Sequence, residues 1–160
     1  MYAEKCTVVQ FADDTQLLIS GPKTHLSEMI FSLESELERI LDWFSQNLLK
    51  INASKTQVIV FGNRAMLRDM PQVSVKVANT QVAETQTVKN LGLVMDKHLT
   101  FQPHIDQLTI KCTGILMGLL HASHVIPRSC LKQIVNALVM SIIRYCISIY
   151  GTCGTTQLYR

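Results

Sequence analysis

Hydrophobic and polar positions follow two different periods along the chain, and each period predicts a type of element. Short β-type runs at residues 8–11 and 16–19 flank a turn at residues 12–15, which predicts a hairpin. Apolar residues recur at helical spacing over residues 26–48 with a plausible N-cap at Thr24, which predicts a one-sided amphipathic helix packed on the sheet. Its glutamates are expected on the solvated face. Further extended runs are expected at residues 57–61, 73–77, 81–84 and 87–96.

After residue 100 the period becomes helical and stays so to the end of the chain. Pro103 suits the first turn of a helix, and the apolar stripe that follows continues to residue 120. Pro127 begins a second helix that extends to about residue 150. We therefore expect an α+β fold, with an antiparallel sheet and a packed helix in residues 1–100 and an all-helical region in residues 101–160.

Charge is distributed unevenly over the 160 residues. The net charge is +3, but residues 1–48 hold eight acidic and three basic side chains, whereas residues 49–160 hold four acidic and twelve basic ones. No acidic residue follows Asp106. This asymmetry suits a cation site in the first part of the chain and a surface that meets phosphates in the second.

Five cysteines form an odd set without a Cys-x-x-Cys pair, which indicates free thiols in a reducing compartment. We therefore expect an intracellular protein, in the nucleus or the cytoplasm. His121 and His124 lie between Cys112 and Cys130, so a zinc site is an alternative. Their spacing fits no zinc-finger pattern, and a structural role is the more frequent one for such histidines.

One apolar run, residues 134–150, is a candidate for a membrane-spanning segment. Asn136 and Arg144 interrupt this run, and a membrane helix needs about 20 consecutive apolar residues. The run is too short to span a bilayer comfortably. We therefore expect no membrane segment and no membrane partner.

Two adjacent aspartates, Asp13 and Asp14, occupy the predicted hairpin turn. They are either solvated turn residues, which is the common role of aspartate, or ligands that converge on a cation. Hard carboxylate oxygens on a short turn suit Mg²⁺, which binds through one or two carboxylates together with substrate phosphates. The pair alone favours the turn role, so the rest of the chain has to decide.

Three blocks of the chain carry a more specific signal. They read FADDTQLLISG, WFSQNLLKINASKTQVIVFG and VKNLGLVMDKHLTFQPHI. In this order and spacing they resemble the aromatic-Ala-Asp-Asp, Asn-x-Leu-x-x-Asn-x-x-Lys-Thr and Leu-Gly-x-x-x-Asp-x-x-Leu-x-Phe-x-x-His-Ile boxes of the reverse transcriptase of non-LTR (LINE-type) retrotransposons. The segment SIIRYCISIYG is a looser match to the end of that family's thumb. The resemblance covers essentially the whole chain.

The resemblance implies a partial polymerase palm in residues 1–100, followed by a helical thumb-like region. The activity that the resemblance implies is that of an RNA-directed DNA polymerase. The 3′-hydroxyl of a DNA primer, paired to an RNA template, would attack the α-phosphate of a deoxynucleoside triphosphate. Two Mg²⁺ (or Mn²⁺) ions about 3.5–4 Å apart would hold the attacking and leaving oxygens. Asp13 would be the principal metal ligand and Asp14 the second carboxylate. Lys55 matches the lysine near the incoming triphosphate, and its alternative role is that of a solvated lysine at a strand end.

The remaining matches concern nucleic acid. Leu91 and Gly92 match the bend that supports the primer end, and their alternative role is an ordinary hairpin bend. Exposed cations of the thumb-like helices would follow duplex phosphates without reading sequence. These cations are Lys111, Arg128 and Lys132.

The chain also departs from the family pattern. The family carries another metal-binding aspartate, together with fingers, well before the Asp-Asp box, whereas this chain begins at Met1. We therefore expect little or no polymerisation by this chain alone, because removing key catalytic electrostatics has large effects on rate. The alternatives are a non-catalytic retroelement remnant that at most binds nucleic acid, and an unrelated binding module.

Overall fold

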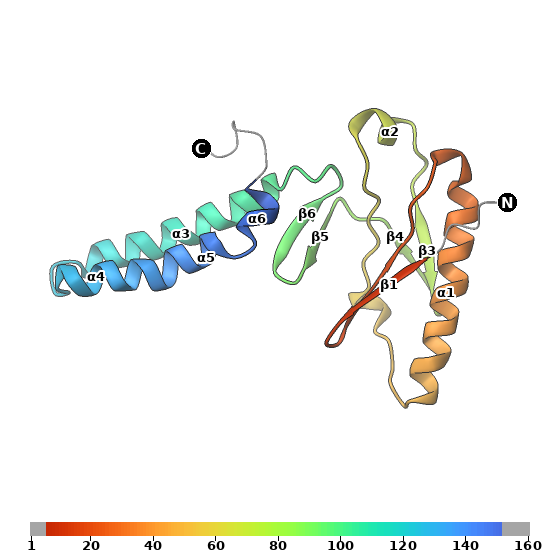
Figure 1. Cartoon of the computed structure of the whole chain (residues 1–160), viewed down its shortest axis with the longest axis horizontal. Helices are drawn as coiled ribbons and strands as arrows, with labels where there is room; N and C mark the ends of the chain where they lie inside the picture. Colours follow the sequence, from red (N-terminus) through yellow and green to blue (C-terminus); the bar gives the residue numbers. More distant parts are fainter. Residues whose placement is uncertain (1–5, 152–160) are drawn as a thin grey trace. The chain divides into compact units, whose positions relative to one another are not determined.

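The computed structural model describes residues 6–151, and the chain divides into two compact units. Unit 1 comprises residues 1–85 and unit 2 comprises residues 86–160. Unit 1 combines two antiparallel strand pairs with helices, and unit 2 combines one such pair with helices (Figure 1). The expected mixture of helices and antiparallel strands is therefore confirmed. The assignment of residues 1–100 to a palm and residues 101–160 to a thumb stays a prediction.

The predicted hairpin at the start of unit 1 is confirmed. Strands β1 (Thr7–Phe11) and β2 (Asp14–Leu18) pair antiparallel, from Thr7 opposite Leu18 to Phe11 opposite Asp14. The second strand begins two residues earlier than expected, so the turn contains only Ala12 and Asp13. Ala12 has a φ of 53°, which a non-glycine residue adopts at a cost of about 1–2 kcal/mol.

The predicted amphipathic helix is also confirmed, as α1 (Leu26–Gln46). Thr24 is not its N-cap, because a short 3₁₀ turn, η1 (Lys23–His25), precedes the helix and the His25 N–H donates to the Pro22 carbonyl. Leu37 of α1 lies in the core of unit 1. The buried residues of this core are Leu37, Val73, Val75 and Val77.

Strands β3 (Ser74–Val77) and β4 (Thr80–Ala83) form the second hairpin, and α1 packs against β3. The period-two pattern of this segment buries alternate valines and leaves the residues between them exposed. Glu34 of α1 is half-buried, and its Oε1 accepts a 2.7 Å hydrogen bond from the Lys76 N–H. The expectation that every α1 glutamate lies on the solvated face is therefore wrong for Glu34.

Residues 57–61 do not form the predicted strand. Val58 makes only an isolated parallel bridge to Glu84, and its carbonyl accepts a 2.7 Å bond from the Thr85 N–H. Val58 and Val60 instead pack their side chains against the core, which accounts for the apolar pattern without a ladder. The antiparallel pairing among the described residues thus takes the form of three two-stranded sheets, and residues 57–61 add no strand to them.

A short helix that the sequence analysis did not predict, α2 (Arg64–Arg68), follows this segment. Asn63 caps it, with its Oδ1 accepting a 2.7 Å bond from the Met66 N–H. Such a cap satisfies one of the free N–H groups of a helix start. The cap was the available sequence signal, because five residues are too few for a periodic pattern.

Unit 2 begins with a third hairpin and continues as a helical pair. Figure 1 shows α3 beside the segment from α4 to α5, with the two running in opposite directions. The predicted first helix is confirmed as α3, whereas the predicted second helix is divided into short segments. The elements of unit 2 are β5 (Thr87–Asn90), β6 (Leu93–Asp96), α3 (Gln102–Ala122), α4 (Arg128–Val135), the π-helical η3 (Asn136–Met140), α5 (Ser141–Arg144) and α6 (Ile147–Tyr150).

The break between α5 and α6 lies at two residues whose backbone is not helical. Tyr145 is extended, with a ψ of 120°, and Cys146 has a left-handed φ of 56°. This break allows Tyr150 to enter the core of unit 2, where it joins Leu93 and Phe101. Buried aromatic rings of this kind contribute a large share of the apolar contact area of a core.

Candidate active site

The Asp13–Asp14 pair lies at the apex of the β1–β2 hairpin. Asp13 is in the two-residue turn, and Asp14 is the first residue of β2. Both side chains are exposed, and neither makes a hydrogen bond or ion pair with another residue of the 6–151 range. Their oxygens therefore remain available to a ligand from solvent.

Adjacent carboxylates repel one another in this position. Two unit charges about 4 Å apart interact by about 1 kcal/mol in water, and more where solvent is excluded. Within residues 6–151, no cation forms an ion pair with Asp13 or Asp14 that would offset this repulsion directly. A divalent cation would do so, and carboxylate oxygens are the ligands that Mg²⁺ prefers.

The hairpin is anchored on one side only. Leu17 of β2 packs against the core of unit 1, whereas all five residues of β1 are exposed, including Phe11 at 62%. The described structure thus holds the turn through β2 and leaves the β1 face uncovered. We expected a covered sheet here, and that expectation is wrong for β1.

Lys55 is held by a local turn. It ends the 3₁₀ segment η2 (Ala53–Lys55), and Asn52 organises this segment by accepting a 3.0 Å bond from the Ser54 N–H at Oδ1. The Thr56 hydroxyl donates to the Asn52 carbonyl at 3.2 Å. The sequence predicts a turn at residues 52–54, because an asparagine before a short polar segment is a turn signal, and the structure confirms it.

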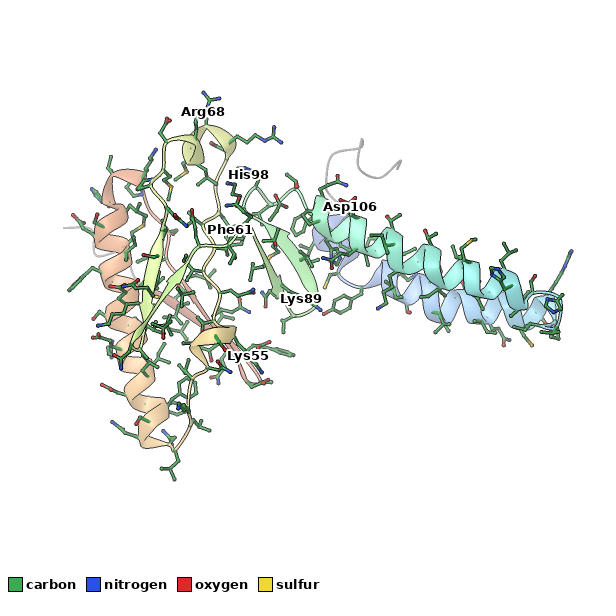
Figure 2. All side chains as sticks on the ribbon, turned by 180° about the vertical axis from the view of Figure 1, so that it is seen from behind. Lys55, Phe61, Arg68, Lys89, His98 and Asp106 are labelled. Carbon is green, nitrogen blue, oxygen red and sulfur yellow. The ribbon has the colours of Figure 1, made fainter. Side chains whose placement is uncertain are left out.

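The Lys55 side chain is exposed and makes no ion pair with any described residue. Ala53 of η2 and Leu17 of β2 pack against the same buried cluster. Figure 2 labels Lys55 at the end of η2 in unit 1. The lysine and the aspartates are thus anchored on one core, without a direct contact.

Leu91 and Gly92 form the two-residue turn between β5 and β6. Their φ values are 46° and 88°, so both residues are left-handed. The Tyr145 hydroxyl donates a hydrogen bond to the Leu91 carbonyl, and a Cβ on Gly92 would lie 3.3 Å from Tyr145 Cε1. Sequence reasoning missed Tyr145, because the contact joins residues 54 positions apart.

Asp96 belongs to a joint rather than to a metal site. Its Oδ1 accepts a 2.8 Å bond from the Phe101 N–H, and its Oδ2 accepts a 3.2 Å bond from the His98 N–H. Phe101 and His104 are buried beneath this loop, and burial lowers the pKa of His104 below its ordinary value of 6.5. The third sequence block therefore connects β6 to α3.

Lys111, Arg128 and Lys132 are exposed on the helical pair. Lys111 lies on α3, whereas Arg128 and Lys132 are four residues apart and share a face of α4. Within residues 6–151, no hydrogen bond or ion pair joins Lys111 to either of the other two. Residues 102–151 hold four basic side chains and one acidic side chain, Asp106 on α3, so the helical pair carries a net positive charge.

The zinc alternative receives no support from the described residues. Cys112 is buried and Cys130 is exposed, and a ring nitrogen of His121 lies 2.7 Å from the Met117 carbonyl oxygen. Within residues 6–151, no three His, Cys, Asp or Glu side chains form a group that could hold a metal ion.

Residues 6–151 also contain no helix long and apolar enough to cross a membrane. The compartment stays a prediction.

Comparison with known proteins decides the family. Residues 1–95 match the model of the reverse transcriptase (RNA-dependent DNA polymerase) family. The chain belongs to the reverse transcriptase family. The matched range contains Asp13, Asp14, Lys55, Leu91 and Gly92, whereas the three helical cations lie outside it. Family membership excludes the unrelated binding module.

Similar proteins come from mobile elements. The chain is 27% identical over 154 residues to the RNA-directed DNA polymerase from mobile element jockey of Drosophila funebris, and 26% identical over 162 residues to that of Drosophila melanogaster. These matches cover 94% and 97% of this reverse transcriptase chain but only 16% and 17% of the relatives. The chain thus spans about a sixth of the length of these relatives.

A third relative is the probable RNA-directed DNA polymerase from transposon BS of Drosophila melanogaster, 28% identical over 110 residues, which are 68% of this chain and 12% of the relative. The resemblance to non-LTR (LINE-type) reverse transcriptases is therefore confirmed. No solved structure matches the chain. Reverse transcriptases generally use divalent metal ions, and the family implies an RNA template, a primer and nucleotide substrates.

Proposed function

We propose that this chain contributes the metal-binding hairpin of an RNA-directed DNA polymerase. In the proposed reaction the 3′-hydroxyl of a DNA primer, paired to an RNA template, attacks the α-phosphate of a deoxynucleoside triphosphate. The observation that carries the proposal is the pair of exposed carboxylates, Asp13 and Asp14, at the apex of a hairpin and without a described partner.

Asp13 is the principal metal ligand in this proposal, because it occupies the turn itself. Asp14 is the second carboxylate, at the start of β2. Both supply the hard oxygen donors that suit Mg²⁺ or Mn²⁺. When bound, two such ions would stabilise the charge that develops on the attacking and leaving oxygens.

The ligand set within the described residues is partial. Since residues 6–151 contain no group of three metal-ligating side chains, the remaining donors would be nucleotide phosphates and a further aspartate of the complete polymerase. Lys55 is the cation for the triphosphate, where it neutralises or protonates the leaving pyrophosphate. Its exposure and lack of a described ion-pair partner support this role.

Unit 2 supplies contacts with nucleic acid in the same proposal. The turn at Leu91 and Gly92 supports the primer end, and the helical cations Lys111, Arg128 and Lys132 contact duplex phosphates. Such contacts position a duplex without reading its sequence. The net positive charge of the helical pair supports this assignment.

Mn²⁺ titration of the 160-residue chain tests the metal site, with broadening of backbone amide signals as the readout. We expect broadening to begin at residues 12–15. Asp13→Asn should abolish it and Asp14→Asn should weaken it. Asp69→Asn is the matched control, because Asp69 is also an exposed carboxylate of unit 1, at the end of α2. Selective broadening that persists in Asp13→Asn would contradict the assignment.

Primer extension separates the polymerase from its alternative, a non-catalytic retroelement remnant that at most binds nucleic acid. The short matched region of the relatives and the partial ligand set favour little extension by this chain alone. The assay is extension of a DNA primer on an RNA template with Mg²⁺ and all four deoxynucleotides. Extension that disappears in Asp13→Asn would refute the remnant.

A further inference from the structure

The turn between β5 and β6 holds a residue that does not suit its conformation. Two-residue hairpin turns with positive φ at both positions favour asparagine, aspartate or glycine at the first position. This turn has leucine there, with a φ of 46° and a side chain that is 42% exposed. Strained residues of this kind are found preferentially at ligand sites, where the surroundings maintain the unfavourable conformation.

Tyr145 is the residue that holds this turn. Its hydroxyl donates to the Leu91 carbonyl, and its ring packs against the side of Gly92 that lacks a Cβ. The helix is interrupted at this residue, since α5 ends at Arg144 and Tyr145 is extended. The tyrosine therefore reaches the turn from a fixed break in the helical segment.

The break itself is attached firmly to the core of unit 2. Tyr150, five residues further on, is 4% exposed, and its ring stacks edge-on against His104 with ring centroids 5.0 Å apart. The Tyr150 hydroxyl donates to the Ile143 carbonyl, which closes the chain around the break. Tyr145 thus starts from a defined backbone position when it contacts the hairpin.

We propose that Tyr145 is a positioning residue for the primer strand: by fixing the Leu91 carbonyl, it presents the exposed Leu91 side chain and the bare Gly92 backbone to the sugar–phosphate chain near the primer's 3′ end. The inference rests on the proposed function, because it assumes that this turn meets the primer. Leucine offers an apolar contact to a sugar. Glycine lets a phosphate approach the main chain closely.

The experiment compares the wild-type chain with Tyr145→Phe, which keeps the ring and removes the hydroxyl. Binding of a fluorescent DNA primer recessed on an RNA template is measured by anisotropy at several salt concentrations. We expect affinity to fall about two- to tenfold, the effect of a single hydrogen bond. The slope of affinity against salt should stay unchanged, since no cation is removed.

A blunt duplex of the same length provides the second probe. Affinity for it should not change in Tyr145→Phe, because the turn is proposed to contact the recessed end. Amide signals of Leu91 and Gly92 should shift in the same variant without any nucleic acid. Thr113→Val is the matched control, since it removes an exposed hydroxyl from α3 of the same unit.

A second variant tests the strain argument. Leu91→Asn places a favoured residue in the turn, so the turn should depend less on the tyrosine. Tyr145→Phe should therefore shift the Gly92 amide less in the Leu91→Asn background than in the wild-type chain. A shift of equal size in both backgrounds would overturn the positioning role.

The outcomes separate the inference from the proposed function. In one outcome the wild-type chain prefers the recessed duplex, and Tyr145→Phe has the same affinity and the same amide signals as the wild type. That outcome overturns the inference and leaves the polymerase proposal in place. Loss of stability in Tyr145→Phe without a change at the turn also overturns it. Wild-type chain that does not distinguish recessed from blunt duplex overturns the primer contact, and the inference with it.

Discussion

Replacing Asp96 with alanine tests the joint between β6 and α3. The change removes two hydrogen bonds from backbone N–H groups to a carboxylate, those of Phe101 at 2.8 Å and His98 at 3.2 Å. Bonds to a charged group contribute about 1.5–3 kcal/mol each, and the half-buried position of Asp96 favours the lower end of that range. Leu99 and Phe101 have left-handed φ values of 53° and 56°, so the loop also stores strain.

We therefore expect Asp96→Ala to lower the free energy of unfolding of unit 2 by about 2–4 kcal/mol. Asp96→Asn should cost about half as much, because its amide oxygen still accepts one bond. The matched control is Asp106→Ala, which removes only a bond from the Gln102 side chain at an exposed site of α3 and should change stability by less than about 0.5 kcal/mol.

Urea unfolding followed by two signals, circular dichroism and tryptophan fluorescence, checks the prediction. Circular dichroism reports the helices, which dominate unit 2, whereas Trp43 on α1 is the sole tryptophan and its fluorescence reports unit 1. The Asp96→Ala transition should move to lower urea by circular dichroism, with a smaller change in Trp43 fluorescence. If Asp96→Ala were as stable as Asp106→Ala, the two backbone bonds would not hold the joint.

Three further predictions concern packing, turn geometry and pH. Val77→Ala truncates a side chain that is 1% exposed and should cost unit 1 about 2 kcal/mol, measured by urea unfolding of Trp43 fluorescence. Gly92→Ala should cost about 1–2 kcal/mol, because alanine is strained at a φ of 88° and meets the Tyr145 ring; circular dichroism measures the loss. The folded pKa of His104 is lowered by burial, so the unfolded chain binds a proton first as pH falls through about 6.5. Stability of unit 2 should therefore fall from pH 7.5 to pH 5.5, and His104→Gln should reduce that dependence.

Local patterns explain which elements were predictable. The helix α1 and the β3–β4 hairpin follow the helical and two-residue periods, because one face of each packs on a single core. Residues 57–61 form no strand despite their pattern, since an apolar run that packs irregularly has the same composition as a strand. The helix α2 depends on the Asn63 cap and carries no period of its own.

The candidate site was predictable only where its signal is local. Asp13, Asp14 and Lys55 stand within short blocks whose turns form from neighbouring residues, as Asn52 does for η2. Tyr145 contributes through a contact 54 residues away, and no pattern along the chain pairs it with Leu91. Contacts of that kind are set by packing, which a single sequence does not display.

The three sequence blocks differ in how far their polar groups are already satisfied. In the third block both oxygens of Asp96 accept backbone hydrogen bonds, so this carboxylate is already used to hold the loop between β6 and α3. In the first and second blocks Asp13, Asp14 and Lys55 keep exposed charges without a described ion pair. Charges that folding leaves unpaired are the ones that a charged ligand can recruit at least cost, because no existing bond has to break. The proposed metal and triphosphate chemistry therefore depends on unit 1, and the proposed contribution of unit 2 is to hold the nucleic acid through Leu91, Gly92 and the helical cations.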